Sequence, residues 1–248
     1  MRIKKYLNEA RIKDVIFKIK RDCDPFLKEM KGSKYFFYRG TTKLIDVIRK
    51  YKPRKNRRPT DSSLLFHNIM DNAFKEKFGW KSRSEGVFAT SDENEEYGDT
   101  STIFFPIGKY KYIWSSSIKD LYEDVEGLLY ILKDNYHFQM EHIKDIDIKS
   151  LSTYSYNLRD IEGLKPYLLD LEGKKLYHSD WNIVEIRKIL EIEAKKEAKN
   201  IANQYTDKNL KKAATSENEV MFKCNEYYIL NMEKIKDSTP NKLLKELL

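Results

Sequence analysis

The fold class follows from three neighbouring segments: Gly86–Ser91 (GVFATS), Thr100–Ile107 (TSTIFFPI) and Lys109–Ser115 (KYKYIWS). Each is short and rich in aromatic and β-branched residues. Turn-forming residues stand between them, and the first gap holds the acidic sequence DENEEYGD. This composition is typical of short strands joined by turns. We therefore expect two or three paired strands in this part of the chain.

Two more segments carry the same β pattern. Lys34–Arg39 (KYFFYR) is aromatic-rich and is closed by Gly40, which predicts a strand that ends at a turn. Glu219–Leu230 (EVMFKCNEYYIL) contains two apolar runs around the polar residues 223–226, and this pattern fits a hairpin. The β-segments are thus spread along the chain, with helices expected between them.

Helical patterns surround these strands. Residues 5–31 place apolar side chains at a mainly 3.6-residue period that Pro25 interrupts, so we expect one or two helices that end at Gly32. Near the other terminus, a short helix is expected from Asn241 onward, after the turn at Pro240.

A further helix is expected between the β-segments Lys34–Arg39 and Gly86–Ser91. Thr60 and Asp61 are N-cap candidates for a helix that runs to about Phe78, and Gly79 is the residue at which it stops. The sequence as a whole shows no repeats, no low-complexity linker and no clear domain boundary.

Helical sequence also fills the region before the last β-segment. Residues 118–135 are predicted to be helical, and residues 182–205 are predicted to form a long amphipathic helix rich in Glu and Lys. The mixed order of strands and helices makes the expected fold class α+β. We expect one domain over 1–248, with N-terminal helices over 1–32 and a central helical insertion over 117–205.

The composition limits the class of protein. The 248 residues carry 47 Lys and Arg against 39 Asp and Glu, a net charge of +8, and 40% are hydrophobic. This is enough apolar surface for a core, and it excludes a wholly disordered chain. The mean hydropathy is −0.71, no stretch approaches the roughly 20 apolar residues of a membrane helix, and the N-terminus lacks the pattern of a secretory signal. We therefore expect a cytoplasmic protein without a membrane partner.

Metal-binding residues are sparse. Cys23 and Cys224 are far apart in the sequence and form no CxxC motif, so we expect free buried thiols and neither a disulfide scaffold nor a zinc site. His137 and His142 are five residues apart and fall on different faces of a helix. No metal is expected.

Basic residues are concentrated in one run. In Arg49–Arg58 (RKYKPRKNRR) seven of ten residues are basic and four of them are Arg. Arginine favours bidentate phosphate contacts, so this run is interpreted either as a phosphate-binding segment or as a solvated loop. The sequence pI of about 9.1 agrees with an affinity for polyanions.

Three polar groups stand beside the β-segments: Tyr38-Arg39-Gly40, Phe88-Ala89-Thr90-Ser91 and Glu217-Asn218-Glu219. The sequence contains no P-loop, GxGxxG, GxSxG or HExxH motif, so the usual nucleotide-binding, hydrolase and metalloprotease signatures are absent. Taken singly, the three groups are most simply interpreted as a surface ion-pair partner, a strand end and a solvated turn. Their order along the chain is more informative than any one of them.

Together the three groups resemble the arginine-serine-glutamate group of ADP-ribosyltransferases. That family has an Arg on its first strand, an S-T-S motif opening the next central strand and an E-x-E motif at the head of a later strand, and these line a cleft that holds NAD. Arg39, Ala89-Thr90-Ser91 and Glu217-Asn218-Glu219 stand in this order, with Ala89 where the family has its first Ser. The resemblance implies a split β-sandwich with the helical segments as additions.

The resemblance also implies a role for each residue. Cleavage of the bond between nicotinamide and ribose builds positive charge on the sugar, and Glu219 is the carboxylate expected to stabilise it. Glu217 would orient or deprotonate the incoming nucleophile, lying on the same face as Glu219 if the segment is extended. Arg39 would grip the diphosphate or ribose, and Gly40 would leave room for the nicotinamide amide.

Four further residues are candidates for binding NAD. Hydroxyl groups of Thr90 and Ser91 would position Glu219 and the ribose. Arg83 is a candidate for phosphate contact and Tyr97 for stacking on nicotinamide. No metal is needed for this reaction.

The resemblance implies a mono-ADP-ribosyltransferase with NAD as its substrate. The acceptor would be a protein arginine, a nucleic-acid base or water, and the polar stretch 205–216, which is expected to be turn-like, matches the family's target-recognition loop. Its lysines, Lys208, Lys211 and Lys212, favour an acidic or nucleic-acid target. Small members of this family are often bacterial or phage toxins or effectors, which adds an antitoxin or inhibitor to the partners considered.

Two other interpretations stay open. A non-catalytic, basic nucleic-acid-binding protein would use the run 49–58 for phosphates and aromatic residues for base stacking. An interaction protein would dock a partner on the helix over 182–205.

Overall fold

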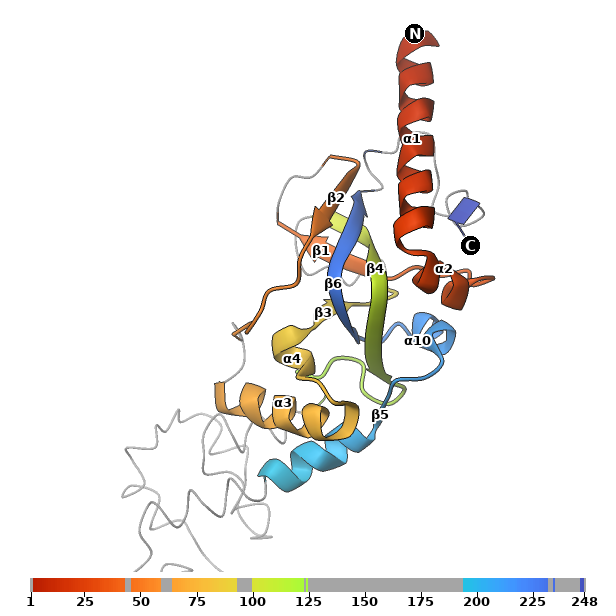
Figure 1. Cartoon of the computed structure of the whole chain (residues 1–248). Coiled ribbons are helices and arrows are strands. Elements are labelled where there is room, and N and C mark those ends of the chain that lie inside the picture. The colour runs from red at the N-terminus through yellow and green to blue at the C-terminus, as the bar shows by residue number, and fades with distance from the viewer. Residues whose placement is uncertain are drawn as a thin grey trace, which may run out of the picture. The chain divides into compact units, whose positions relative to one another are not determined.

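The structure, a computed structural model, describes residues 2–42, 46–58, 64–92, 100–122, 124, 194–231, 234 and 246–247 (Figure 1). The chain divides into two units, Met1–Arg57 with Phe78–Leu121 and Gln204–Leu248, and Arg58–Lys77 with Tyr122–Asn203. Several predictions fall outside the described residues: the caps at Thr60 and Asp61, Tyr97, most of 118–135, and the start of the C-terminal helix at Asn241.

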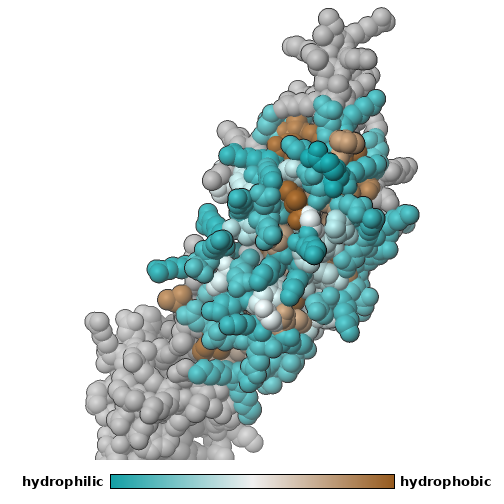
Figure 2. Space-filling model, viewed as in Figure 1, coloured by the Kyte–Doolittle hydropathy of each residue, from teal (hydrophilic) through white to brown (hydrophobic). Residues whose placement is uncertain are grey.

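Hydrophilic side chains cover most of the visible face of the described residues (Figure 2). Among the described residues, the exposed large hydrophobic side chains are Phe17, Tyr35 and Leu64. Within the described residues, no helix combines the length and the apolar character needed to cross a membrane.

Six strands form one antiparallel sheet among the described residues of the first unit. They are β1 (Tyr38–Thr41), β2 (Ile48–Tyr51), β3 (Val87–Ala89), β4 (Thr100–Ser115), β5 (Tyr205–Thr206) and β6 (Val220–Asn231). The order is β1-β4-β6-β2, β3 also pairs with β6, and β5 pairs with β4. The long strands β4 and β6 lie side by side through the centre (Figure 1). Strands mixed with helices confirm the α+β class.

β4 is one continuous strand where the sequence predicts two. Gly108 lies within β4 and has a φ of 66°, and the register of β4 against β6 shifts between Ile107 and Tyr110. Glycine adopts this left-handed backbone without a steric penalty, so the extra residue is absorbed as a bulge and no turn forms. The three segments therefore form two strands, β3 and β4, the lower of the two numbers expected, and both pair with β6.

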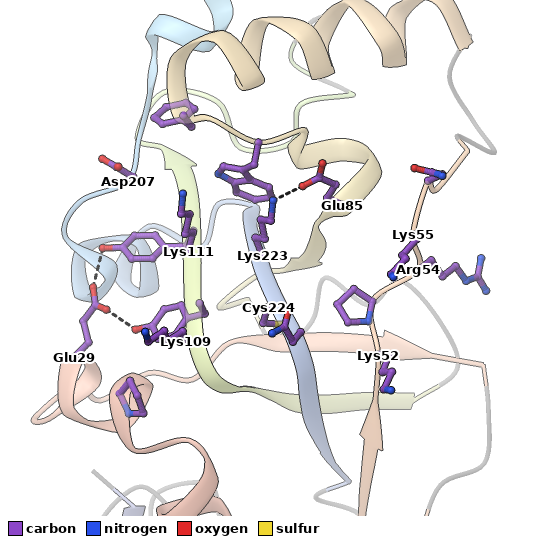
Figure 3. Close-up of a pocket in the computed structure, with 18 residues that line it drawn as sticks. Glu29, Lys52, Arg54, Lys55, Glu85, Lys109, Lys111, Asp207, Lys223 and Cys224 are labelled. Atoms are coloured by element: carbon purple, nitrogen blue, oxygen red, sulfur yellow. Dashed lines mark hydrogen bonds and ion pairs between the residues drawn. The ribbon is translucent and has the colours of Figure 1, made fainter.

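β6 is also a single strand, so the hairpin predicted over 219–230 is wrong. The two charged residues of this stretch stay within the ladder with partners of opposite charge: Lys223 forms an ion pair with Glu85 (Figure 3), and Glu226 forms one with Lys50 of β2 at 2.6 Å. Polar side chains that are neutralised in this way do not require a turn.

β1 begins later than the sequence predicts. The segment 34–39 is expected to be a strand closed by Gly40, but pairing starts at Tyr38, and Gly40 lies inside the strand. Phe36 and Phe37, which precede the strand, are 2% and 0% exposed. Their aromatic character therefore reflects burial in the core more than strand pairing.

Two N-terminal helices confirm the prediction for residues 5–31. They are α1 (Arg2–Asp22) and α2 (Asp24–Met30). Pro25 stands in the first turn of α2, where its missing N–H breaks no helical hydrogen bond. Gly32 follows α2 with a φ of 80°, a conformation that suits glycine and ends the helical segment.

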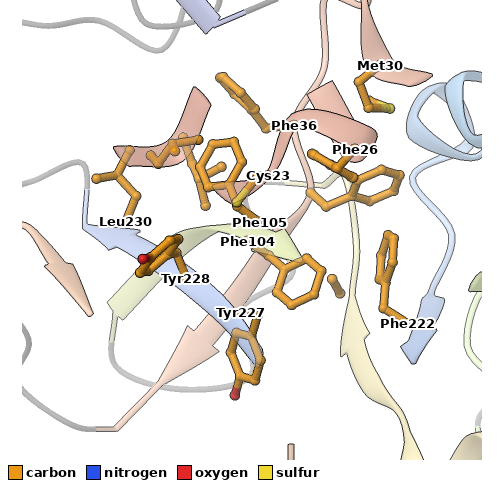
Figure 4. Packing of buried hydrophobic residues seen from close by; sticks show 14 of the residues in the cluster. Cys23, Phe26, Met30, Phe36, Phe104, Phe105, Phe222, Tyr227, Tyr228 and Leu230 are labelled. Atoms are coloured by element: carbon orange, nitrogen blue, oxygen red, sulfur yellow. The ribbon is translucent and has the colours of Figure 1, made fainter. Parts of the chain in front are cut away.

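The core of the first unit is built from aromatic rings of α2 and the sheet (Figure 4). The Phe26 ring lies 6.1 Å from that of Phe105 and 6.4 Å from that of Phe222, both edge to face. Phe222 also contacts Phe104, with 4.9 Å between ring centroids. Aromatic pairs at these separations add to the stabilisation from burial. Cys23 and Cys224 are both buried free thiols, as predicted.

The second unit contains most of α3 (Leu64–Phe78) and the helix over 194–203. The Lys77 ammonium group donates hydrogen bonds to the carbonyl oxygens of Ala202 and Asn203, at 2.9 and 3.1 Å. Lys199 and Glu76 form an ion pair at 3.0 Å. These contacts place the end of α3 beside the described part of the helix predicted over 182–205, and Gly79, with a φ of 78°, follows α3 as predicted.

Candidate active site

Arg39 lies on β1 and reaches across to the neighbouring strand β3. Its guanidinium Nη1 donates a hydrogen bond of 2.8 Å to the carbonyl oxygen of Phe88. Its own carbonyl oxygen accepts a hydrogen bond of 2.6 Å from the Thr102 hydroxyl, and its guanidinium lies 6.0 Å from the centre of the Tyr227 ring. Both ends of the residue are therefore held in place.

Thr90 joins the three polar groups of the sequence. Its backbone pairs with Tyr38, which precedes Arg39: the Tyr38 N–H donates to the Thr90 carbonyl oxygen at 2.6 Å and the Thr90 N–H to the Tyr38 carbonyl oxygen at 3.1 Å. Its hydroxyl donates a hydrogen bond of 2.7 Å to the carbonyl oxygen of Glu217. The groups around residues 39, 90 and 217 are therefore brought together.

The glutamates lie in the connection between α10 (Leu210–Ser216) and β6. Glu217 has left-handed backbone angles, φ 61° and ψ 5°, so the condition under which Glu217 and Glu219 would share one face, an extended segment, is not met at Glu217. The side-chain Nδ2 of Asn218 donates a hydrogen bond of 2.8 Å to the Ser115 carbonyl oxygen, and the backbone N–H of Glu219 donates one of 2.8 Å to the Lys119 carbonyl oxygen. Glu217 is exposed and Glu219 is half buried.

The stretch before these glutamates is more ordered than the sequence predicts. Residues 205–216, expected to be turn-like, form β5 and α10. Lys208, Lys211 and Lys212 are exposed there, while Leu210, Ala213 and Ala214 are buried in the core. The apolar positions of this stretch were obscured by its lysines.

Arg57 is a member of the site that sequence reasoning missed. Its guanidinium lies over the Phe88 ring, 4.4 Å from the centroid. The backbone N–H of Arg57 donates a hydrogen bond of 3.1 Å to the Ser84 carbonyl oxygen. Burial lowers the pKa of Arg57, as do the nearby charges of Arg39 and Arg83, while Glu219 opposes this shift. Arg57 belongs to the basic run 49–58, but no motif separates it from its neighbours.

The charges around Arg57 define what the site can hold. Arg39 and Arg83 lie close enough to Arg57 to lower its pKa, and Glu219 lies close enough to raise it. Several cations that repel one another in a partly buried place form a site that an anion stabilises. Glu219 contributes a carboxylate whose Oε1 atom is buried. The arrangement therefore suits a ligand with both an anionic part and a part that becomes cationic.

The other predicted residues surround this group. Ser91 is 7% exposed, and its hydroxyl oxygen has no hydrogen-bond partner among the described residues. Gly40 lies within β1, next to Arg39. Arg83 is half buried in the short helix α4 (Ser82–Glu85), and Tyr97 lies outside the described residues.

The described residues also form a cavity, but it is lined by other side chains (Figure 3). Within the described residues, no three His, Cys, Asp or Glu side chains gather as metal ligands would. Comparison of the chain with protein-family models, with curated proteins and with solved structures finds no match.

Proposed function

We propose that this protein is a mono-ADP-ribosyltransferase that cleaves NAD and transfers ADP-ribose to a macromolecule. The observation that carries the proposal is the hydrogen bond from Thr90 to Glu217, together with the backbone pairing of Thr90 with Tyr38. These contacts gather the arginine, the threonine-serine pair and the glutamates that the resemblance to this family singles out. The proposal includes the fold: the sheet is one part of a split β-sandwich.

Glu219 stabilises the sugar as its bond to nicotinamide breaks. The bonding electron pair leaves with the nicotinamide nitrogen, and C1 of the ribose becomes cationic. A half-buried carboxylate beside that carbon attracts the charge more strongly than an exposed one, because less water screens it. Ser91 offers a buried hydroxyl with bonding capacity left for the ribose or for Glu219.

Arg39, Arg57 and Arg83 bind the diphosphate of NAD. Burial lowers the pKa of Arg57 most, and the charges of Arg39 and Arg83 lower it further. An anion that enters beside these guanidinium groups compensates both effects, which makes binding of the diphosphate favourable. The Phe88 ring beneath Arg57 and the Phe88 carbonyl oxygen bound to Arg39 set the positions of the two guanidinium groups.

Glu217 acts on the acceptor. It is exposed, and its backbone is fixed by the Thr90 hydroxyl. A nitrogen or oxygen of the acceptor forms the new bond to C1 of the ribose, and the proton it loses passes to the Glu217 carboxylate. When water takes the place of the acceptor, the product is free ADP-ribose.

The test is release of nicotinamide from NAD by the Glu219→Gln protein. We expect this variant to bind NAD, measured by calorimetry, and to release nicotinamide at least about a hundred-fold more slowly, because a transition-state charge loses its partner. Glu226→Gln is the matched control, since Glu226 is also a half-buried carboxylate, lies further along the chain on β6 and forms an ion pair with Lys50. Equal rates for Glu219→Gln and the unaltered protein would remove Glu219 from this role.

A second candidate function is nucleic-acid binding without catalysis. It is favoured by the exposed side chains of Arg54 and Lys55, which have no carboxylate partner among the described residues. Binding of RNA or DNA with a steep dependence on salt, but with no loss of NAD in the presence of any acceptor, would support this function over the transferase.

A further inference from the structure

A cavity of about 1070 Å³ lies in the first unit, apart from the predicted site residues. Figure 3 shows its walls: the segment 52–56, residues 109–112 of β4 and residues 223–225 of β6. The rest of the lining comes from Pro25 and Glu29 of α2 and from Phe78, Trp80, Glu85 and Asp207. The lining contains none of the residues that form the candidate active site, so the cavity is separate from that site.

The cavity is basic. Its lining contains six cationic side chains, Lys52, Arg54, Lys55, Lys109, Lys111 and Lys223, and three carboxylates, Glu29, Glu85 and Asp207. Two of the carboxylates are engaged within the protein. Glu29 accepts hydrogen bonds from the hydroxyl groups of Tyr110 and of Tyr112, the latter at 2.8 Å, and Glu85 pairs with Lys223.

Four of the cations are available to a ligand. Arg54, Lys55, Lys109 and Lys111 are exposed and have no carboxylate within 4 Å among the described residues. Lys52 is 4.0 Å from Glu226, at the limit of an ion pair. Cations gathered around a hollow repel one another unless an anion joins them. The cavity therefore suits a ligand that carries several negative charges.

The segment 52–57 connects this cavity to the candidate active site. Its residues 52–56 line the cavity. Arg57 lies over the Phe88 ring, and the charges of Arg39 and Glu219 affect the pKa of Arg57. Arg57 is the third residue after Arg54, and these three steps span at most about 11 Å of extended chain. A polyanionic polymer lying in the cavity is therefore within reach of the site where ADP-ribose would be transferred.

We propose that the cavity binds a single-stranded nucleic acid by its phosphates and presents it as the acceptor of ADP-ribose, an inference that rests on the proposed transferase function. The fork of Arg54 matches a phosphate group, and the lysines match the neighbouring charges. A single strand is preferred to a duplex because a base that is to react must leave its stack and its pair. A base nitrogen then attacks C1 of the ribose, nicotinamide leaves with the electron pair of its bond, and the proton of the base passes to Glu217.

The test measures binding and transfer separately. A fluorescent RNA or DNA strand of about 20 nucleotides is titrated with the unaltered protein, with Lys109→Gln/Lys111→Gln and with Arg54→Gln/Lys55→Gln, over a range of salt concentrations. Each pair of substitutions is expected to weaken binding about ten-fold and to reduce the slope of log affinity against log salt by about 1.4, or about 0.7 for each lost phosphate contact. Lys13→Gln/Lys20→Gln is the control, because it removes two exposed charges of α1 that are outside the cavity.

The outcomes separate the two proposals. Equal binding by the cavity variants and the control overturns the cavity as a strand site, and so does tighter binding of polyglutamate or of a duplex than of the single strand. Nicotinamide release by the unaltered protein, measured without any strand, reports on the transferase alone. Release without label transfer from NAD to the strand overturns the nucleic-acid acceptor and leaves the transferase standing. Strand binding that depends on the cavity cations, with no nicotinamide release, supports the cavity as a strand site and overturns the transferase.

Discussion

The hydroxyl group of Thr90 donates a hydrogen bond of 2.7 Å to the carbonyl oxygen of Glu217, which is 127 residues further along the chain. Thr90 is 3% exposed, so the bond is shielded from water. The same residue pairs through its backbone with Tyr38, on the strand of Arg39. One buried threonine therefore sets the positions of the arginine and the glutamates relative to each other.

Replacing Thr90 with Val keeps the shape of the side chain and removes the hydroxyl. We expect the free energy of unfolding to fall by about 1–3 kcal/mol, because a shielded carbonyl loses its donor. Nicotinamide release is expected to fall at least about ten-fold, since the glutamate segment shifts. Thr90→Ser, which keeps the hydroxyl, is expected to restore most of the activity; a Thr90→Ser protein as slow as Thr90→Val would show that the hydrogen bond is not what positions the glutamates.

Replacing Arg57 with Gln is expected to weaken NAD binding. The variant loses one of the cations proposed to hold the diphosphate, so the KM for NAD should rise about ten-fold or more with a smaller change in kcat. Steady-state kinetics of nicotinamide release measures both constants. Arg21→Gln is the control, because Arg21 is an exposed arginine paired with Asp22 on α1. A fall in kcat at constant KM would contradict a role in ground-state binding.

The sequence predicts those elements whose cause is local. The apolar period of residues 5–31 and the position of Pro25 predict α1 and α2, because the apolar face of a helix and the proline that interrupts it are both visible in the local sequence. The long strands β4 and β6 were predicted as broken, because the partner that neutralises Lys223 and the bulge at Gly108 are set by residues distant in the sequence. Local pattern cannot show such partners.

The sequence likewise predicts some residues of the candidate site and not others. Arg39, Thr90 and Glu217 were found from the order of short motifs, and the structure brings them together. Arg57 was not found, because it depends on the path of the segment 52–57 to the Phe88 ring. The left-handed backbone of Glu217 was also missed, since the sequence gives no glycine or asparagine at that position.

The two cysteines are expected to be inert in the folded protein. Burial raises the pKa of Cys23 and of Cys224 to about 12, against an ordinary value near 9. At pH 8 a thiol reagent should therefore label them only on unfolding, which is measured by absorbance with and without denaturant.

The same pKa shifts predict how stability depends on pH. The buried thiols have a higher pKa in the folded protein than in the unfolded chain, so the unfolded chain ionises first as the pH rises. Their contribution to the free energy of unfolding is therefore fully present below pH 9 and is lost as the pH rises from about 9 toward 12. Cys23→Ala/Cys224→Ala should lose less stability than the unaltered protein between pH 8 and pH 10.5, as measured by urea denaturation. An equal loss in both proteins would contradict these shifts.

Glu217 combines a strained backbone with a proposed role in transfer, and the two can be separated by substitution. A non-glycine residue in the left-handed region costs about 1–2 kcal/mol, so Glu217→Gly should raise the free energy of unfolding by about 1 kcal/mol. Glu217→Gln keeps the strain and should leave stability unchanged. Both should lower the transfer of label from NAD to an acceptor about ten-fold or more, because each lacks the carboxylate that takes the proton.

The control for the backbone is Asn209→Gly, since Asn209 also has a left-handed conformation, with φ 61° and ψ 57°. We expect it to raise stability by less than Glu217→Gly does, because asparagine adopts the left-handed conformation at a lower cost than glutamate, and to leave label transfer unchanged. Retained transfer in both Glu217 variants would restrict Glu217 to a structural role, in which its carbonyl oxygen holds Thr90 and its carboxylate does nothing. Transfer lost in Glu217→Gln at unchanged stability would assign the effect to the carboxylate, because in that variant the backbone and its hydrogen bond are the same as in the unaltered protein.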